Sequence, residues 1–471
     1  MKLMKRMFVL LLAGLMLLSA VSCGQTQTNT AASGATALEG KYANMTDEEY
    51  FEKEFKPILR FVVASDVHIH DTGSDLEEER LPKLFDVAYD YAKKQKGYKE
   101  LDAVLIAGDF VDRGTPNSMK KAFALANESV KGDTVFHAIM GNHEFYHEEK
   151  STPATEKNWL AASGYDSPDA HLIIGGYHFI MVSPDSGGKG YSNKKQNWLA
   201  DELKKAAADD PTGRKPIFVL QHHHISDTVY GSGAWGVEDL RKTLNNYPQV
   251  IDFSGHSHFP ISDPTSMWQD EFTALGTGTL SYYEMGLAGV DPDYIFPIDD
   301  EGSWAEKKSG ERDAAQFYIV EVDANNAIKI QGYDLLSDTF MIEPYLLRTV
   351  GDPAEFKYTN ARAEASEVPV FPEDAAIEIV NLTAFGAKLR FPQASCKDNV
   401  QHYRCELYLN GELKDTVYSL SCTFFRPTPE TISAIFSKVY AGKEYTVKIY
   451  AVNSWAKDSE PLVGSFTVPN Y

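Results

Sequence analysis

Five short polar segments, each directly after an apolar run of strand length, constrain this chain more than any other feature. The runs span 59–64, 101–107, 134–140, 216–220 and 250–253. The segments after them are Asp66-Val-His68, Gly108-Asp109-Phe-Val-Asp112-Arg113-Gly114, Gly141-Asn142-His143-Glu144, His222-His223-His224 and Gly255-His256-Ser-His258. Helical periodicity at 81–94, 119–130 and 197–207 predicts strands alternating with helices. We therefore expect a layered α/β domain that brings the five segments to one sheet edge.

The residue types in these segments indicate a metal site. Eight of the 13 histidines lie in or beside them. Taken singly, each segment is typical of a solvated turn, but together they would crowd carboxylates and imidazoles that need partners or metal ions. Carboxylate, amide and imidazole ligands without thiolate suit Mn, Fe or Zn. Two such ions ~3.5–4 Å apart, joined by a shared aspartate, would activate water and neutralise a phosphoryl group.

In order and type, these motifs resemble those of the calcineurin-like metallophosphoesterase superfamily over about residues 59–259. The resemblance implies a four-layer α-β-β-α sandwich that holds two metal ions. It further implies the role of each site residue: Asp66, His68 and His258 hold one metal, Asn142, His222 and His256 hold the other, Asp109 bridges them, His143 is the general acid, Asp112 orients it and Arg113 holds phosphate.

Other residues distinguish this chain from related families or leave alternatives open. Ile69 follows His68 where phosphoprotein phosphatases have Gly, and Asp112 stands where purple acid phosphatases have a Tyr ligand, so no tyrosinate–iron colour is expected. In the triple histidine, His222 follows the strand and is the expected ligand, with His223 as the alternative. For His70 and His224, a supporting or solvent-exposed position is at least as good an interpretation as a catalytic role. The aromatic residues Tyr230, Trp235 and Phe259 could stack on substrate, but packing of the loops is the slightly better interpretation.

The N-terminal region predicts export. Three basic residues precede an apolar run at 7–18, which is shorter than the ~20 residues that a membrane-spanning helix needs. Cys23 then follows small residues and resembles the lipidated cysteine of a bacterial lipoprotein. We expect residues 1–22 to be a signal peptide and lipid on Cys23 to anchor the protein at the cell surface or in the periplasm; ordinary secretion is the alternative. Residues 23–55 are predicted to be a flexible tether.

The chain changes character after the α/β region. We assign 56–350 to the phosphoesterase domain and 351–367, rich in Ala, Glu and Pro, to a linker. Residues 368–471 have no helical period; alternation before Asn410-Gly411 predicts a two-residue hairpin, and 445–452 a further strand. This part resembles a fibronectin type III β-sandwich, which would contact surface glycan or protein. Its three cysteines allow one disulfide or none.

Composition and charge narrow the function. The 471 residues, 43% apolar, are enough for two or three domains with their own cores. A formal charge of −22 repels phosphate backbones, so no nucleic-acid binding is expected. We predict hydrolysis of a phosphate-ester small molecule or nucleotide-like substrate by in-line attack of a metal-bridging hydroxide. Gly-His-x-His resembles the phosphodiesterase branch; the alternatives are a phosphomonoesterase and a surface-binding protein with an inactive phosphoesterase scaffold.

Overall fold

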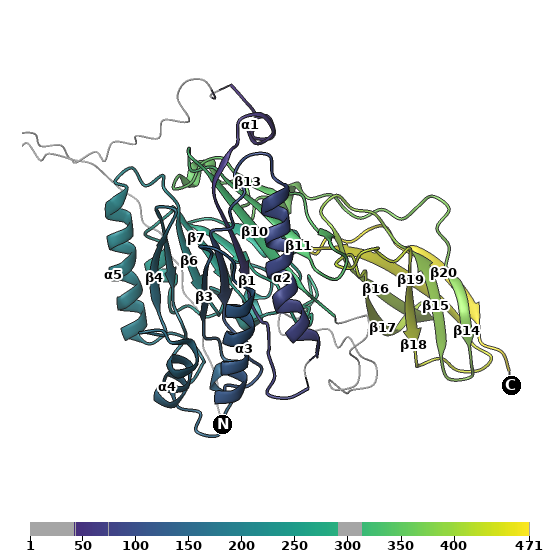
Figure 1. Cartoon of the computed structure of the whole chain (residues 1–471). Helices are drawn as coiled ribbons and strands as arrows, with labels where there is room; N and C mark the ends of the chain where they lie inside the picture. Colours follow the sequence, from purple (N-terminus) through teal and green to yellow (C-terminus); the bar gives the residue numbers. More distant parts are fainter. Residues whose placement is uncertain (1–41, 43, 74, 291–312, 471) are drawn as a thin grey trace, which may run out of the picture. The chain divides into compact units, whose positions relative to one another are not determined.

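A computed structural model describes residues 42, 44–73, 75–290 and 313–470 of the chain (Figure 1). The predicted signal peptide 1–22, Cys23 and the first part of the predicted tether lie outside the described residues. Helices and strands of the described residues all lie in the compact unit Met45–Tyr471. Within these ranges, no helix is long and apolar enough to cross a membrane.

The first sheet combines parallel and antiparallel strands. Its strands are β1 (Pro57–Ala64), β2 (Ala103–Ala107), β3 (Val135–Ile139), β10 (Gln316–Asp323), β11 (Ile328–Asp334), β12 (Thr339–Phe340) and β13 (Tyr345–Leu347). The order is β12-β11-β10-β1-β2-β3, and β13 also pairs with β11. Because β1, β2 and β3 are parallel neighbours, the segments that follow them leave the sheet at the same edge.

The second sheet repeats this arrangement with different strands. They are β4 (Ala170–Ile174), β5 (Tyr177–Met181), β6 (Ile217–Gln221), β7 (Val250–Ser254), β8 (Met267–Gln269) and β9 (Thr273–Gly276). The order is β4-β5-β6-β7-β9-β8, with β6 and β7 parallel and Gln221 paired with Ser254. The triple histidine and the Gly-His-x-His segment therefore begin at neighbouring strand ends.

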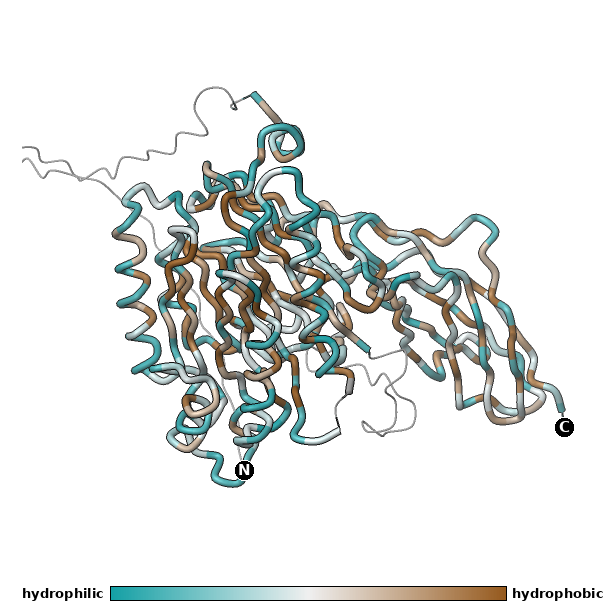
Figure 2. Tube along the Cα trace, in the orientation of Figure 1, coloured by the Kyte–Doolittle hydropathy of each residue, from teal (hydrophilic) through white to brown (hydrophobic). Residues whose placement is uncertain are grey.

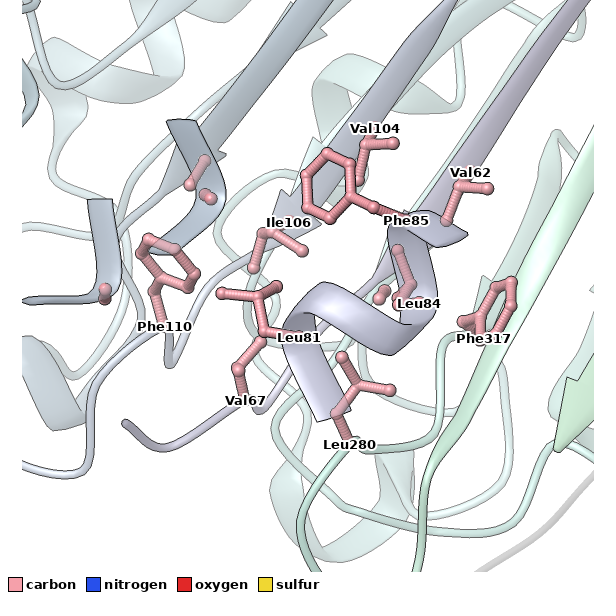
Figure 3. Packing of buried hydrophobic residues seen from close by; sticks show 14 of the residues in the cluster. Val62, Val67, Leu81, Leu84, Phe85, Val104, Ile106, Phe110, Leu280 and Phe317 are labelled. Atoms are coloured by element: carbon pink, nitrogen blue, oxygen red, sulfur yellow. The ribbon is translucent and has the colours of Figure 1, made fainter. Parts of the chain in front are cut away.

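Three hydrophobic clusters join these sheets to each other and to helices. The helices of the α/β region are α2 (Asp75–Lys94), α3 (Pro116–Ser129), α4 (Thr152–Ser163), α5 (Asn193–Asp209), α6 (Ser232–Trp235) and α7 (Arg241–Leu244). Leu81 and Phe85 of α2 pack with Val104 and Ile106 on one face of the first sheet (Figure 3). The strands are the most hydrophobic part of this region (Figure 2).

The opposite face of the first sheet packs on the second sheet. Phe61 of β1 meets Phe179 of β5 and Phe218 of β6 edge-on, at ring distances of 4.9 and 4.8 Å. The far face of the second sheet shares a third cluster with α5, which contributes Leu199 and Leu203. Alternate strand residues enter different clusters because side chains alternate between sheet faces. The predicted α/β class is confirmed, and the exact four-layer arrangement stays a prediction.

The predicted strands and helices of the α/β region are present with shifted ends. The five apolar runs correspond to β1, β2, β3, β6 and β7. The helices α2, α3 and α5 begin several residues before the predicted 81–94, 119–130 and 197–207. Their first turns carry polar and capping residues, such as Thr115 before Pro116, which lie outside the apolar period.

The prediction of a flexible tether at 23–55 is wrong for its last part. Helix α1 (Asp47–Lys53) begins there, and Thr46 and Glu49 form a capping box at its start. Tyr50 is fully buried and its hydroxyl donates to the carboxylate of Asp323. A capping box, the buried ring of Tyr50 and ion pairs of Asp47 with Arg348 and Lys357 hold this helix. None of these contributes to the apolar periodicity used to predict helices.

The predicted linker 351–367 also contains regular structure, with η3 (Pro353–Glu355) and α8 (Arg362–Ala365). The backbone N–H groups of Lys357 and Tyr358 both donate to Gln269 Oε1 on β8, at 3.0 and 2.9 Å. This segment therefore packs on the second sheet.

The C-terminal part is all-β, as predicted. Its strands are β14 (Glu378–Leu382), β15 (Ala387–Pro392), β16 (Val400–Leu409), β17 (Glu412–Leu420), β18 (Thr431–Phe436), β19 (Glu444–Asn453) and β20 (Leu462–Thr467). They form the antiparallel sheets β14-β15-β18 and β17-β16-β19-β20, which share one hydrophobic cluster. Asn410 and Gly411 have φ values of 53° and 81°, which confirms the two-residue hairpin between β16 and β17. Its fibronectin type III identity stays a prediction.

We expect Asp252→Asn to stabilise the protein at neutral and alkaline pH. Asp252 on β7 is fully buried and accepts one hydrogen bond from Gln221, and burial raises its pKa from 3.8 to about 7. The unfolded chain ionises first, so wild-type stability falls as pH rises from 3.8 to about 7, whereas Asn does not titrate. At ~1.4 kcal/mol per pKa unit, the variant gains up to about 4 kcal/mol above pH 7. Urea unfolding at pH 4.5 and pH 8 measures this difference; an equal effect at both pH values would contradict the assignment.

Candidate metal centre

Backbone hydrogen bonds tie together the loops that follow neighbouring strands. Asp66 N–H donates to the Gly108 carbonyl at 3.0 Å, and His68 N–H donates to the Asp109 carbonyl at 3.1 Å. In the second sheet, Gly255 N–H donates to the His222 carbonyl at 2.9 Å. These bonds continue the parallel ladders beyond the strand ends and set the spacing of the polar segments.

Side-chain acceptors then connect the segments to one another. His143 N–H donates to Asp109 Oδ1 at 2.8 Å. His256 N–H, from the second sheet, lies 3.1 Å from Asp66 Oδ2, which belongs to the first sheet. The two carboxylates thus hold the loops after β3 and β7. The bond from Gly255 N–H to the His222 carbonyl adds the loop after β6, so all five predicted segments meet in one place.

The backbone at these loop ends is strained. Asp66, His68, Asp109, His256 and His258 have φ values of 52°, 56°, 47°, 74° and 59°. Such left-handed conformations cost on the order of 1–3 kcal/mol for a residue other than Gly and concentrate at functional sites. Five predicted site residues share this conformation, which indicates that the folded structure holds their side chains inward at an energetic cost.

A glycine allows a close approach between the loops that follow the two sheets. Gly108 has φ of 91°, and a Cβ at this position would overlap the ring of His222. Only Gly meets both requirements without strain. The glycine before Asp109 is therefore needed for packing as well as for the turn.

The first donor group contains Asp66, His68, Asp109 and His258, all buried, with ligand atoms within 4.8 Å of one another. His258 Nε2 lies 3.2 Å from Asp66 Oδ1 and 3.1 Å from His68 Nε2. His258 Nδ1–H donates to the Tyr282 carbonyl at 3.0 Å, which leaves the Nε2 lone pair directed into the group. Two imidazole nitrogens and a carboxylate that converge in this way fit a bound cation.

The second donor group contains Asp109, His222 and His256. His222 Nε2 lies 3.1 Å from Asp109 Oδ2 and 2.9 Å from Asn142 Oδ1, while its Nδ1–H donates to the Ala107 carbonyl at 3.0 Å. Asp109 belongs to both groups. The structure therefore brings His222, and not His223, to the shared carboxylate.

The carboxylates and imidazoles of the site shift one another's pKa values. Burial disfavours the imidazolium of His222, but the Asp109 carboxylate outweighs burial and raises its pKa to about 9. The pKa of Asp109 is held well below its usual value, because the neighbouring imidazoles outweigh the opposing effect of burial. The carboxylate, amide and imidazole donors that gather here suit Mn, Fe or Zn.

The predicted catalytic residues lie beside the donor groups, with one difference in contacts. His143 Nδ1–H donates to the backbone carbonyl of Asp112 at 2.8 Å, whereas the nearest Asp112 carboxylate oxygen is 3.7 Å from Nδ1. The backbone of Asp112, rather than its carboxylate, orients His143. Arg113 has a side chain 76% exposed, and its Nε lies 3.9 Å from Asp112 Oδ2.

The remaining predicted neighbours have mainly structural contacts. Tyr230 donates to the Gly286 carbonyl, and its ring lies 4.4 Å from that of Phe259, so these aromatics pack the loops. The Trp235 ring lies 5.5 Å from His256. His224 bonds the hydroxyls of Ser254 and Ser257, each at 2.8 Å, behind the donor groups. His70 is 41% exposed and lies 3.4 Å from Asp112 Oδ2.

Two positioning side chains were not predicted. Glu144 is buried and accepts the backbone N–H groups of Gly141 and Val111, at 2.5 and 3.1 Å, which joins the loops after β2 and β3. Burial, with a further contribution from Asp109, raises its pKa to about 8. The Tyr146 hydroxyl accepts from Asn142 Nδ2 at 3.0 Å and so directs Oδ1 toward His222. Glu144 stood within a noted segment, but no local pattern signals either contact.

Comparisons with known proteins agree with this geometry. Residues 59–260 match the family model of the calcineurin-like phosphoesterases. An uncharacterized metallophosphoesterase of Helicobacter pylori (strain ATCC 700392 / 26695) is 25% identical over 209 residues, which cover 43% of this chain and 46% of that protein. One from strain J99 / ATCC 700824 is 24% identical over 237 residues, covering 49% and 54%. The chain thus spans about half the length of the curated relatives it matches.

Solved structures are also similar to a part of the chain. The solved fn3 domain of the human collagen alpha-1(XX) chain is 14% identical, covers 22% of this chain and 87% of that domain, and has a TM-score of 0.17. For the α/β region, the family match spans all five polar segments and both donor groups. Residues 59–260 are a calcineurin-like phosphoesterase domain.

Proposed function

We propose that the chain is an exported phosphoesterase that uses two metal ions to hydrolyse a phosphate ester. One observation carries the proposal: two groups of oxygen and nitrogen donors share the buried carboxylate of Asp109. In this proposal Asp66, His68 and His258 hold one ion, and Asn142, His222 and His256 hold the other. When bound, two ions of Mn, Fe or Zn would supply activated water and positive charge for the phosphoryl group.

His143 is proposed as the general acid. The Asp112 carbonyl accepts its Nδ1–H, and Nε2 lies 3.9 Å from Asp109 Oδ2, at the shared carboxylate. The imidazolium form of His143 keeps this bond and carries a second proton on Nε2, which it can donate to a leaving oxygen bound beside Asp109. Arg113 lies at the solvent-exposed side, where its guanidinium can grip a phosphate oxygen pair as substrate enters.

The substrate class follows from charge and site chemistry. The acidic chain disfavours nucleic acid, so we propose a small phosphate ester or a nucleotide-like molecule, with a phosphodiester favoured. Export and a lipid anchor on Cys23 remain part of the proposal and rest on residues 1–23. Comparing bis(4-nitrophenyl) phosphate with 4-nitrophenyl phosphate separates diesterase from monoesterase activity.

Asp109→Asn is expected to remove bound metal and activity together. The substitution keeps the shape of the side chain but removes the charge that both donor groups share. Substituting even a residue that only hydrogen-bonds a metal ligand lowers metal affinity or activity about 10–100-fold. Loss of the shared ligand should therefore lower activity at least ~100-fold. Metal analysis and hydrolysis of both substrates measure this, with the exposed Asp86→Asn as the control. Wild-type turnover in Asp109→Asn would refute the proposal.

His143→Gln is expected to slow turnover while bound metal is retained. Loss of a general acid costs ~10²–10⁴-fold when the leaving group needs a proton, and less for 4-nitrophenolate. Hydrolysis rates of methyl 4-nitrophenyl phosphate and of a dialkyl phosphate compare a leaving group that needs little protonation with one that needs a proton. Equal losses with both leaving groups, or loss of metal, would exclude the general-acid role.

A further inference from the structure

We propose that the C-terminal β-sandwich helps to position the metal ligand His258. Its residues Phe424 and Gln401 are the positioning residues. This inference rests on the proposed function, in which His258 is a metal ligand. It assigns the sandwich a role within the enzyme in addition to any contact with surface glycan or protein.

The connection begins at His258. Its Nδ1–H donates to the Tyr282 carbonyl, and its own carbonyl accepts Glu284 N–H at 3.2 Å. Residues 280–288 thus hold both the imidazole ring and the backbone carbonyl of His258. A residue that accepts the second N–H of a ligating imidazole sets the ring orientation and the basicity of the donor nitrogen.

The α/β domain itself secures only part of this segment. Arg80 of α2 donates to the carbonyls of Leu280 and Ser281, at 3.2 and 2.9 Å. Further along, Tyr230 donates to the Gly286 carbonyl. The side chains of Tyr283, Met285 and Leu287 instead enter a separate hydrophobic cluster.

The sandwich supplies much of that cluster. Leu420 and Phe424 belong to it, and Phe424 meets the Tyr283 ring edge-on at 4.8 Å. Tyr283 and Phe424 are 1% and 2% exposed. Phe424 therefore packs against the residue next to the carbonyl that holds His258.

A polar contact reinforces the same connection. Gln401 Oε1 accepts Ala288 N–H at 2.7 Å, at the end of the segment. Gln401 Nε2 lies 3.4 Å from Asp263 Oδ2, and Ser454 Oγ donates to that same oxygen at 2.8 Å. Asp263 follows the loop that carries His256 and His258, so the sandwich holds both chain segments that meet at His258.

The test measures the affinity of Mn²⁺ for the metal-free full chain, in the wild type and in three variants. Phe424→Ala should weaken one of two bound Mn²⁺ ions roughly tenfold, the lower end for residues that support a ligand. Gln401→Met, a milder change, should weaken the same ion a few-fold. Phe436→Ala is the matched control, because Phe436 is fully buried in the sandwich cluster and lies outside the contacts with residues 280–288. The Mn²⁺ affinity of this variant should stay within about twofold of the wild-type value.

Amide hydrogen exchange supplies a readout that needs no metal. Glu284 N–H should exchange faster in Phe424→Ala and Gln401→Met than in Phe436→Ala, because its bond to the His258 carbonyl loosens. Unchanged Mn²⁺ affinity and exchange in both test variants, or an equal loss in the control, would overturn the inference. If Phe424→Ala does not fold, Gln401→Met decides by the same criteria. Absence of Mn²⁺, Fe²⁺ and Zn²⁺ binding in wild type would refute the proposed function, while the exchange comparison would still decide whether the sandwich holds His258.

Discussion

The carboxylate of Asp109 lies between imidazoles from both sheets, and this contact organises the whole edge. Its Oδ1 accepts His143 N–H, and its Oδ2 lies 3.1 Å from His222 Nε2. A buried carboxylate is costly unless positive charge or hydrogen bonds surround it. The fold meets this requirement by bringing ligand atoms from distant segments within 4.8 Å of one another. In the proposed function, the same concentration of donors is the site for cations and, through them, for a phosphate ester.

The two sheets make this convergence possible. Parallel neighbours in each sheet release their loops at one edge, and the clusters around Phe61 and Leu199 hold the sheets against each other and against α5. Left-handed backbone at Asp66, Asp109 and His256 turns the side chains inward. The hydrophobic packing of the sheets offsets this strain, so the stability of the core and the geometry of the site depend on each other.

The contacts of the C-terminal sandwich extend this dependence beyond the family-matched region. Residues 280–288 lie outside 59–260, yet the Tyr282 carbonyl determines which nitrogen of His258 faces the donor group. Phe424 and Gln401 hold this segment from the other side. Under our proposal, the appended module takes part in the metal centre without supplying any ligand.

Some features of this protein follow from local sequence and others only from the assembled chain. Strand-length apolar runs followed by Asp, Asn and His predicted the α/β class and the meeting of five segments. The runs and the polar residues after them are local features, and parallel strands of an α/β sheet present their carboxyl ends at one edge. The Asn410-Gly411 turn was predictable for the same reason. Tertiary structure alone decided that His222 rather than His223 faces Asp109, that the Asp112 carbonyl orients His143, and that Tyr50 anchors a helix in the expected tether. Each of these depends on which distant group lies within hydrogen-bond or packing distance, and spacing along the chain carries no such information.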